Sequence, residues 1–405
     1  MFDHDMILNH IDDIFGQDMH AKRVLSLANA THGVIGSGSL AIHAIGNGLS
    51  LVSGLDRKHA VKQVDRLLAN PKLNVWRLFE DWVPYVVGER AEIVVSMDWT
   101  EFDADDHSSL VISLQTSHGR STPLLWKTHQ KSLLKGKRNA HERELLTKLK
   151  QTLPEGVFVT VVADRGFGYM ELFERLEQEL GFAYIIRFKG NILVGYPEME
   201  QVAASNWLTP TGRTRTLKEV ELTKQRHHVE RVYCCHKSGM KDPWFLASNR
   251  TDLSAAKALQ LYGQRWGIET SFRDIKDDRF GLGMGEVHIR NPARRDRLFL
   301  FSALAIVLLT LLGKAGDSAG LERTIKVNTS KSRTYSFFRQ GIIYYQLLPK
   351  MKEANAVLLM EKFIYYLKQH RLYTRTLGII PIGLNIRSVL SNLGYKVTSP
   401  APHRQ

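Results

Sequence analysis

The chain has 405 residues, 43% apolar and 24% charged, as expected for a soluble globular protein of two or three domains; this excludes a disordered or fibrous chain. Its formal net charge is +14. Residues 321–405 contain 14 Lys and Arg but only 3 acidic residues, whereas the rest of the chain is nearly balanced. A basic region beside a nearly neutral body indicates a surface for a polyanion, with nucleic acid as the first candidate. A merely soluble basic protein remains the alternative.

The cysteines and the apolar segments restrict the compartment. Cys234 and Cys235 are adjacent, so they form neither an ordinary disulfide nor a zinc site with CxxC spacing. The acidic N-terminus does not resemble a signal peptide. The most apolar run, residues 298–312, is shorter than the roughly 20 residues that cross a bilayer, so we expect a buried core helix there. We therefore expect a cytoplasmic protein without a membrane partner, associated with the nucleoid when it binds DNA.

Residues 1–85 are predicted to be helical. Apolar residues recur at helical spacing over 5–15 and 20–31, and Gly33, Gly36 and Gly38 then break the pattern. Two further helices are expected over 40–49 and 58–68.

The helix expected over 58–68 carries a basic stripe. Lys58, Lys62 and Arg66 recur every four residues, away from the apolar face of the helix. The stripe predicts contact with DNA and makes residues 1–85 a candidate DNA-binding domain. A solvated basic face on an ordinary helix fits the pattern equally well.

The next segment alternates strands and helices. Strands are expected over 92–98, 110–116, 122–128, 157–164 and 183–188, with helices over 137–151 and 169–180. This order is that of the ribonuclease H-like fold. Asp98 and Asp164 then lie where the first and fourth strands end.

The remaining boundaries follow from changes in pattern. Polar and apolar residues alternate from 190 to 249 with Gly and Pro between them, which predicts an inserted antiparallel β region. The chain becomes helical again from residue 252. We expect an α/β protein with the following parts: an N-terminal helical domain (1–85), the first part of a ribonuclease H-like core (86–190), a β-rich insertion (191–249), the second part of the core (250–320) and a basic C-terminal helical region (321–405).

One helix of the second core part carries four polar side chains at helical spacing. Tyr262, Arg265, Glu269 and Lys276 fall within a stripe about 60° wide on one face of this helix. The stripe could be a solvated surface. A single Glu among Arg, Lys and Tyr also suits a carboxylate that binds metal beside a phosphodiester, with the cations on phosphate and the Tyr hydroxyl in a hydrogen bond to the DNA.

The two strand-end aspartates complete a candidate metal site. Mg²⁺ prefers oxygen ligands, and two such ions about 3.5–4 Å apart can activate a nucleophile and stabilise the leaving oxygen. Asp at the end of a strand is also a common turn residue, so either Asp98 or Asp164 alone is weak evidence. Together with the Glu269 helix, they favour catalysis.

These residues carry a resemblance to a known family. The spacing from Tyr262 through Arg265 and Glu269 to Lys276 is that of the Y-(2)-R-(3)-E-(6)-K signature of transposases of the insertion-sequence 4 type, relatives of the Tn5 transposase. Asp98 in MDWT and Asp164 in ADRGF resemble the two catalytic aspartates of that family. The resemblance extends from about residue 58 to 313.

The resemblance implies a mechanism and partners. Asp98, Asp164 and Glu269 would bind two divalent ions, Mg²⁺ or in its place Mn²⁺, for cut-and-paste movement of double-stranded DNA through nicking, a hairpin at the element end and strand transfer. A homodimer is expected in the DNA complex, because two ends must be joined. In the Tn5-like enzymes a Trp late in the β insertion receives a flipped base; Trp244 occupies the comparable place, although it could simply pack in the insertion.

Two rival functions remain open. A ribonuclease H-like nuclease would cleave DNA with the same carboxylates but without strand transfer. A DNA-binding protein descended from a transposase would use no metal chemistry, although the presence of all three carboxylates argues against it.

Overall fold

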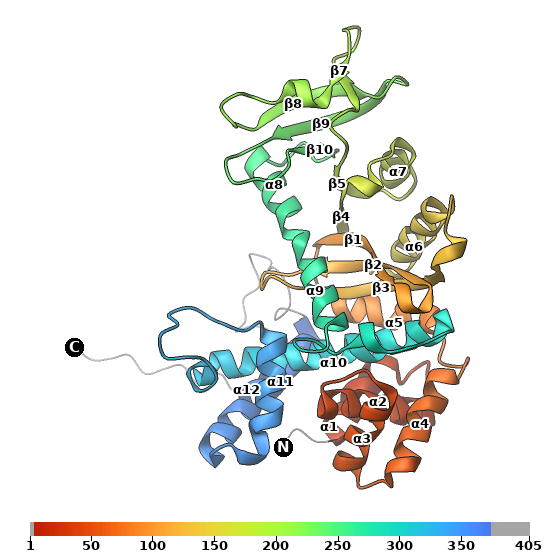
Figure 1. Ribbon diagram of the computed structural model, residues 1–405, viewed down its shortest axis with the longest axis vertical. Coiled ribbons are helices and arrows are strands. Elements are labelled where there is room, and N and C mark those ends of the chain that lie inside the picture. Colours follow the sequence, from red (N-terminus) through yellow and green to blue (C-terminus); the bar gives the residue numbers. More distant parts are fainter. Residues whose placement is uncertain (1–3, 374–405) are drawn as a thin grey trace, which may run out of the picture.

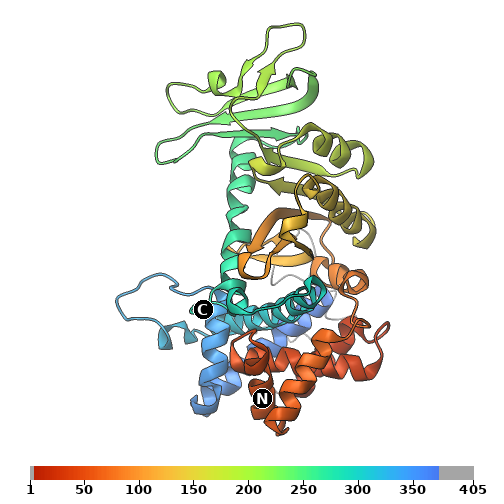
Figure 2. The same ribbon diagram turned by 45° about the vertical axis from the view of Figure 1, so that its right-hand side comes forward.

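The computed structural model describes residues 4–373 and has three tiers along its longest axis (Figures 1 and 2). The strands of the β insertion lie at one end, the central sheet in the middle, and the N-terminal and C-terminal helices at the other end. Residues 374–405, the last part of the expected basic C-terminal region, lie outside the described residues.

A ten-stranded sheet runs through the molecule in the order β3-β2-β1-β4-β5-β10-β9-β8-β6-β7. Its strands are β1 (Glu92–Phe102), β2 (His107–Gln115), β3 (Ser121–Gln130), β4 (Phe158–Ala163), β5 (Ala183–Arg187), β6 (Leu193–Gly195), β7 (Val202–Ala203), β8 (Arg215–Leu222), β9 (His227–Cys235) and β10 (Trp244–Ser248). The first five strands have antiparallel β3-β2-β1 pairing and parallel β1-β4-β5 pairing. This is the expected ribonuclease H-like core.

The β insertion continues the core sheet. β10 pairs antiparallel with β5, and β9 and β8 follow it outward. The expected β-rich insertion is therefore present, and it is joined to the core through backbone hydrogen bonds. A side chain at the start of β10 is consequently held at a fixed place relative to β5.

The helices cover both faces of the core sheet. They are α1 (His4–Phe15), α2 (Ala21–Ser37), α3 (Ile42–Ser53), α4 (Arg57–Ala69), α5 (Val75–Val87), α6 (Arg138–Thr152), α7 (Met170–Glu174), α8 (Ala255–Gln264), α9 (Trp266–Lys276), α10 (Pro292–Ser318), α11 (Phe337–Leu347) and α12 (Glu353–Tyr373). Because side chains alternate along a strand, Val94 of β1 packs in the cluster that includes α8, whereas Val95 packs in the cluster that includes α6. Asp98 shares the face of Val94.

Helix α10 is the core of the helical tier. It is long and apolar enough to cross a membrane by length and composition, but 89% of its most apolar window is buried inside the protein. It contacts β3, α2, α11 and α12, and it crosses beneath the sheet in Figure 1. The expectation that residues 298–312 form a buried core helix is confirmed.

The prediction that Gly33 and Gly36 break the second helix was wrong, whereas Gly38 does end it. α2 continues through Gly33 and Gly36 and ends at Ser37, where Gly38 adopts a left-handed conformation (φ 61°). A Cβ on Gly33 would lie 2.4 Å from the carbonyl oxygen of Ile45 in α3. The glycine at this position thus permits close contact between two helices, which a sequence pattern does not distinguish from a helix end.

Two glycines of α2 give a matched test of this close contact. Gly33→Ala should lower the free energy of unfolding by about 1–3 kcal/mol, because the new methyl group overlaps the backbone of α3. Gly36→Ala adds the same group where the nearest atom is 3.6 Å away, so improved helix propensity should leave stability unchanged or raised by up to about 1 kcal/mol. Urea unfolding measures both, and equal effects would contradict the packing argument.

Candidate active site

Asp98 lies within β1, not at its end. The expectation of a strand over 92–98 was too short, because β1 continues to Phe102 as the antiparallel partner of β2. The parallel pairing of β1 with β4, however, stops at Met97 and Ala163. Asp98 therefore follows the last residue that β4 pairs with, and its side chain is 21% exposed.

Asp164 follows β4 directly and begins a tight turn. Its Oδ1 accepts a hydrogen bond from the backbone N–H of Gly166 at 2.7 Å. Because Met97 and Ala163 are register partners, Asp98 and Asp164 are the next residues on two adjacent parallel strands. The sheet thus brings these two aspartates together, as the sequence predicted.

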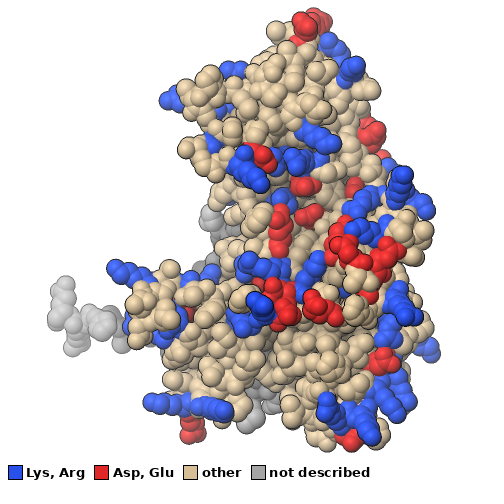
Figure 3. Space-filling model, in the orientation of Figure 1, with Lys and Arg blue, Asp and Glu red and all other residues tan. Residues whose placement is uncertain are grey.

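Glu269 reaches the same place from α9. Arg265 joins it to Asp98: the guanidinium donates to Glu269 Oε1 at 2.8 Å and to Asp98 Oδ2 at 3.4 Å. The three side chains are 33%, 12% and 21% exposed in the order Glu269, Arg265, Asp98, so they lie partly buried. Figure 3 shows acidic side chains along the middle of the molecule, with Lys and Arg around them.

The expected single helix from Tyr262 to Lys276 is interrupted. α8 ends at Gln264 and α9 begins at Trp266, with one tight turn at Arg265, whose N–H donates to the Tyr262 carbonyl at 3.0 Å. Tyr262 and Arg265 remain neighbours, with the guanidinium 5.9 Å from the centre of the phenol ring.

Lys276 lies at the far end of this stripe. Its Nζ donates to the backbone carbonyl of Glu101 at 2.5 Å and to Thr100 Oγ1 at 3.4 Å. The lysine thus attaches the end of α9 to the last part of β1. It is not in contact with Glu269, although both belong to the same sequence motif.

Burial governs the electrostatics of the site. It raises the pKa of Asp98 to about 7; Arg265 opposes this rise, and the negative charges of Asp164 and Glu269 add to it. The effect of both carboxylates on Asp98 shows that the three acids are close enough to interact. Their mutual repulsion is the property that a bound cation would relieve.

The donor set fits a divalent metal ion. Asp98, Asp164 and Glu269 supply only carboxylate oxygens, the ligands that Mg²⁺ and Mn²⁺ accept, and they approach from two strands and one helix. A second group, Glu219, His228 and Glu230, also has ligand atoms within 4.8 Å of one another. It lies on β8 and β9 in the insertion and is separate from Asp98 and Glu269.

Tyr262 and Trp244 form one wall beside the carboxylates. Tyr262 is 3% exposed, and burial raises its pKa. The ring of Trp244, at the start of β10, meets the Tyr262 ring edge to face, with centroids 4.7 Å apart. The structure therefore places Trp244 near the site, as half-buried packing against α8.

Two residues of the site escaped the sequence analysis. Arg187 ends β5, next to the strand of Asp164; its guanidinium donates to the Pro243 carbonyl at 2.9 Å, and it counters the effect of burial on the pKa of Tyr262. Its signal was a lone cation at the end of a buried apolar strand. Trp266 follows Arg265 directly and is 61% exposed, an unusual state for a residue of this size, but exposure cannot be read from the sequence.

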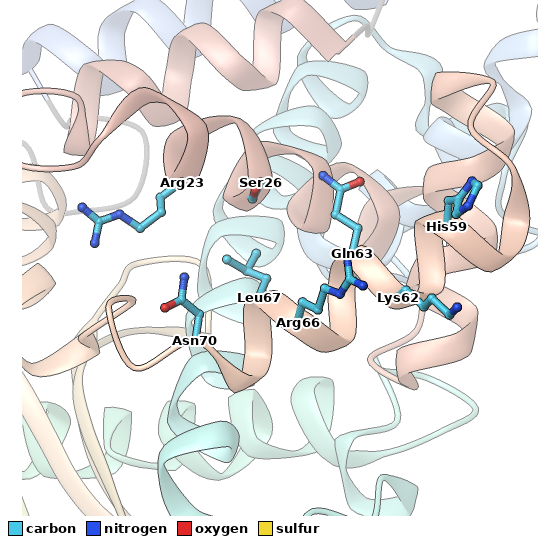
Figure 4. A pocket seen from close by; sticks show the side chains of 8 residues that line it. All are labelled: Arg23, Ser26, His59, Lys62, Gln63, Arg66, Leu67 and Asn70. Atoms are coloured by element: carbon cyan, nitrogen blue, oxygen red, sulfur yellow. The ribbon is translucent and has the colours of Figure 1, made fainter.

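The basic stripe of α4 borders a separate cavity of about 490 Å³ between α2 and α4 (Figure 4). Lys62 and Arg66 line it, whereas Lys58 does not. α2 adds Arg23, whose guanidinium also donates to the carbonyl of Lys72 at 2.9 Å. No carboxylate is among the lining residues, which are Arg23, Ser26, His59, Lys62, Gln63, Arg66, Leu67 and Asn70.

Comparison with known families was consistent with this geometry. A family model described as a transposase DDE domain matches residues 90–308, a span that contains Asp98, Asp164 and Glu269. No curated protein matches the sequence.

The pKa of Asp98 predicts a pH-dependent stability. Between its ordinary value of 3.8 and about 7, the folded protein holds a proton that the unfolded chain releases, so the free energy of unfolding falls as pH rises through this window. Asn cannot ionise. The free energy of unfolding of Asp98→Asn, relative to that of the wild type, should therefore rise by about 2 kcal/mol as the pH is raised from 5.5 to 8.5. Thermal unfolding with a chelator present measures the gain; a pH-independent difference would contradict it.

Proposed function

The chain belongs to the transposase DDE domain family, and we propose that Asp98, Asp164 and Glu269 are its catalytic metal ligands. The family acts on DNA with divalent metal ions. The observation that carries the assignment is the Arg265 guanidinium, which joins Asp98 to Glu269 at the point where β1 and β4 stop pairing. Three carboxylates from distant segments are held together there.

When bound, two divalent ions would lower the pKa of the attacking hydroxyl and stabilise the leaving oxygen of the phosphodiester. The three carboxylates would determine the positions of the two ions. Arg265, already partly buried, would orient a phosphate through paired N–H donors, and Arg187 and Tyr262 would supply further donors on the side of Asp164. Lys276 would act by fixing α9 to β1 as well as by its charge.

We propose that the reaction is cut-and-paste transposition of the insertion-sequence 4 type, related to that of the Tn5 transposase. In it, one strand is nicked, the freed 3′-hydroxyl attacks the opposite strand to form a hairpin, and the opened end is later joined to target DNA. A hairpin requires the terminal bases to leave the stack. Trp244 beside Tyr262, and the exposed Trp266 beside Arg265, offer aromatic faces for such bases.

DNA contacts away from the carboxylates are proposed for α4. Lys62 and Arg66 of α4 and Arg23 of α2 line a cavity whose lining residues include no carboxylate (Figure 4). Phosphate is the ligand that this arrangement suits. We propose residues 1–85 as a DNA-binding domain and the basic region from residue 321 as a further contact for DNA or for the partner in a dimer.

A nuclease without strand transfer is the second candidate, because the same carboxylates would serve hydrolysis alone. The two functions differ in their products: a nuclease yields linear fragments, whereas transposition yields a hairpin and joined strands.

The catalytic assignment predicts a large loss of activity. Asp164→Asn and Glu269→Gln should each lower the rate of DNA cleavage at least about 1,000-fold, because a metal ligand is lost. The assay uses a labelled duplex from the ends of the mobile element and Mg²⁺, with products separated under denaturing conditions. Asp278→Asn is the control, an exposed aspartate just after α9, and should retain full activity. Cleavage by Asp164→Asn at the wild-type rate would refute the assignment.

The α4 cavity predicts a salt-dependent DNA affinity. Lys62→Ala and Arg66→Ala should each reduce the slope of log affinity against log salt by about 1, the value for one lost phosphate contact. Lys58→Ala removes the same charge from the same helix but outside the cavity, so its effect should be smaller. Titration of labelled duplex at several salt concentrations gives the slopes. Equal slopes for all three variants would show that only net charge matters.

A further inference from the structure

A buried carboxylate lies on the face of the sheet opposite α9. Glu142 belongs to α6 and is 3% exposed. Burial raises its pKa, while hydrogen bonds from Trp99 and Tyr169 oppose the rise. Burying a carboxylate costs free energy unless its oxygens accept hydrogen bonds. None of the roles proposed above uses it.

The two oxygens of Glu142 are divided between two segments of the site. Oε1 accepts from Trp99 Nε1 at 2.9 Å, and Oε2 accepts from the Tyr169 hydroxyl at 2.8 Å. Trp99 directly follows Asp98, and Tyr169 lies five residues after Asp164. One side chain thus joins the segment of each aspartate.

Because Trp99 is adjacent to Asp98 in β1, its hydrogen bond to Glu142 also restrains Asp98. Successive side chains of a strand point to opposite faces, so holding the indole against α6 fixes the Asp98 side chain toward α9. Arg138, also on α6, lies over the Trp99 ring at 4.6 Å and donates to Glu101 at 2.8 Å. The indole is therefore held both at its N–H and on its face.

The hydrogen bond from Tyr169 to Glu142 restrains Asp164 through the short turn that joins the two residues. Asp164 accepts from Gly166, and the N–H of Tyr169 donates to the Phe167 carbonyl at 3.0 Å. A Cβ on Gly168 would lie 2.7 Å from the Arg187 carbonyl, so the turn is packed closely on β5. A short, packed turn tied at Tyr169 leaves Asp164 little freedom.

β1 and β4 are no longer paired at the two aspartates, although β2 still pairs with Asp98. The β1–β4 register ends at Met97 and Ala163, one residue before each of them, and their charges repel. Beyond this last pair, the hydrogen bonds of Glu142 to Trp99 and Tyr169 connect the two segments.

We propose that Glu142 is a positioning residue that sets the separation of Asp98 and Asp164, and with it the affinity of the site for divalent metal. The proposal rests on the proposed function, because it assumes that these aspartates bind metal. Partners that orient metal ligands typically change metal affinity by about 10–100-fold when they are lost, and an indirect link such as this belongs at the lower end of that range.

Direct binding of Mn²⁺ to the full chain tests the proposal, with free Mn²⁺ followed by its paramagnetic resonance signal. Glu142→Met removes both acceptors at similar volume and should weaken Mn²⁺ binding about tenfold. Glu142→Gln keeps one acceptor oxygen and should recover part of the loss. Tyr169→Phe and Trp99→Phe each remove one donor and should give smaller losses. Glu144→Gln is the control, the same change at an exposed position of the same helix.

Cleavage of the labelled end at increasing Mn²⁺ gives the second readout. The Glu142→Met variant should need about tenfold more Mn²⁺ for half-maximal rate, while its rate at saturating Mn²⁺ stays within about threefold of the wild type. A lowered melting temperature with unchanged Mn²⁺ affinity would overturn the proposal and leave Glu142 a packing residue. If Glu142→Met fails to fold, Tyr169→Phe and Trp99→Phe decide in the same way.

The Asp164→Asn variant distinguishes a wrong metal site from a wrong role for Glu142. If it binds Mn²⁺ as tightly as the wild type, the metal site itself is misassigned and both proposals fall. If it loses Mn²⁺ while the Glu142, Trp99 and Tyr169 variants keep the wild-type affinity, only the positioning role is refuted.

Discussion

The repulsion among three carboxylates is the constraint on which the site depends. Asp98, Asp164 and Glu269 are distant in the sequence, and like charges do not gather without support. The support is visible in each element: the β1–β4 register brings the aspartates side by side, and Arg265 holds Glu269 against Asp98. Burial is the main cause of the raised pKa of Asp98, and the charges of Asp164 and Glu269 add to it, so a cation bound among the carboxylates would stabilise the ionised form of Asp98.

The surrounding fold serves this convergence. The insertion is hydrogen-bonded to the core through β10 and β5, so Trp244 stands against Tyr262 and not on a separate domain. Lys276 fastens the end of α9 to β1 on one face of the sheet, and Glu142 ties the two aspartate segments on the other face. The N-terminal helices lie on α10, away from the carboxylates, and carry their own basic cavity between α2 and α4. The proposed chemistry and the proposed DNA contact thus lie on different tiers of the molecule.

The sequence predicted the core sheet because its signals are local. Apolar runs predict β4 and β5. The side chains from Tyr262 to Glu269 remain neighbours despite the break at Arg265, because only one tight turn separates α8 from α9. The errors came from long-range contacts. The pattern around Gly33 predicts a helix end, but a glycine is needed there because the backbone of α3 packs against it. That backbone is 12 residues away along the chain, so the local pattern does not show the contact. Likewise, Trp266 and Glu142 carry no local pattern, and Arg187 has only the weak signal of a cation at the end of an apolar strand. The packed structure shows their partners or their exposure.

Asp98, Asp164 and Glu269 are proposed to form the divalent metal site. Anomalous diffraction from a crystal soaked in Mn²⁺ tests it most directly, because it locates the metal without reference to activity. We expect anomalous density among Asp98, Asp164 and Glu269, with Arg265 displaced from its bridge between Asp98 and Glu269. Density at Glu219, His228 and Glu230 of the insertion, with none at Asp98, would contradict it.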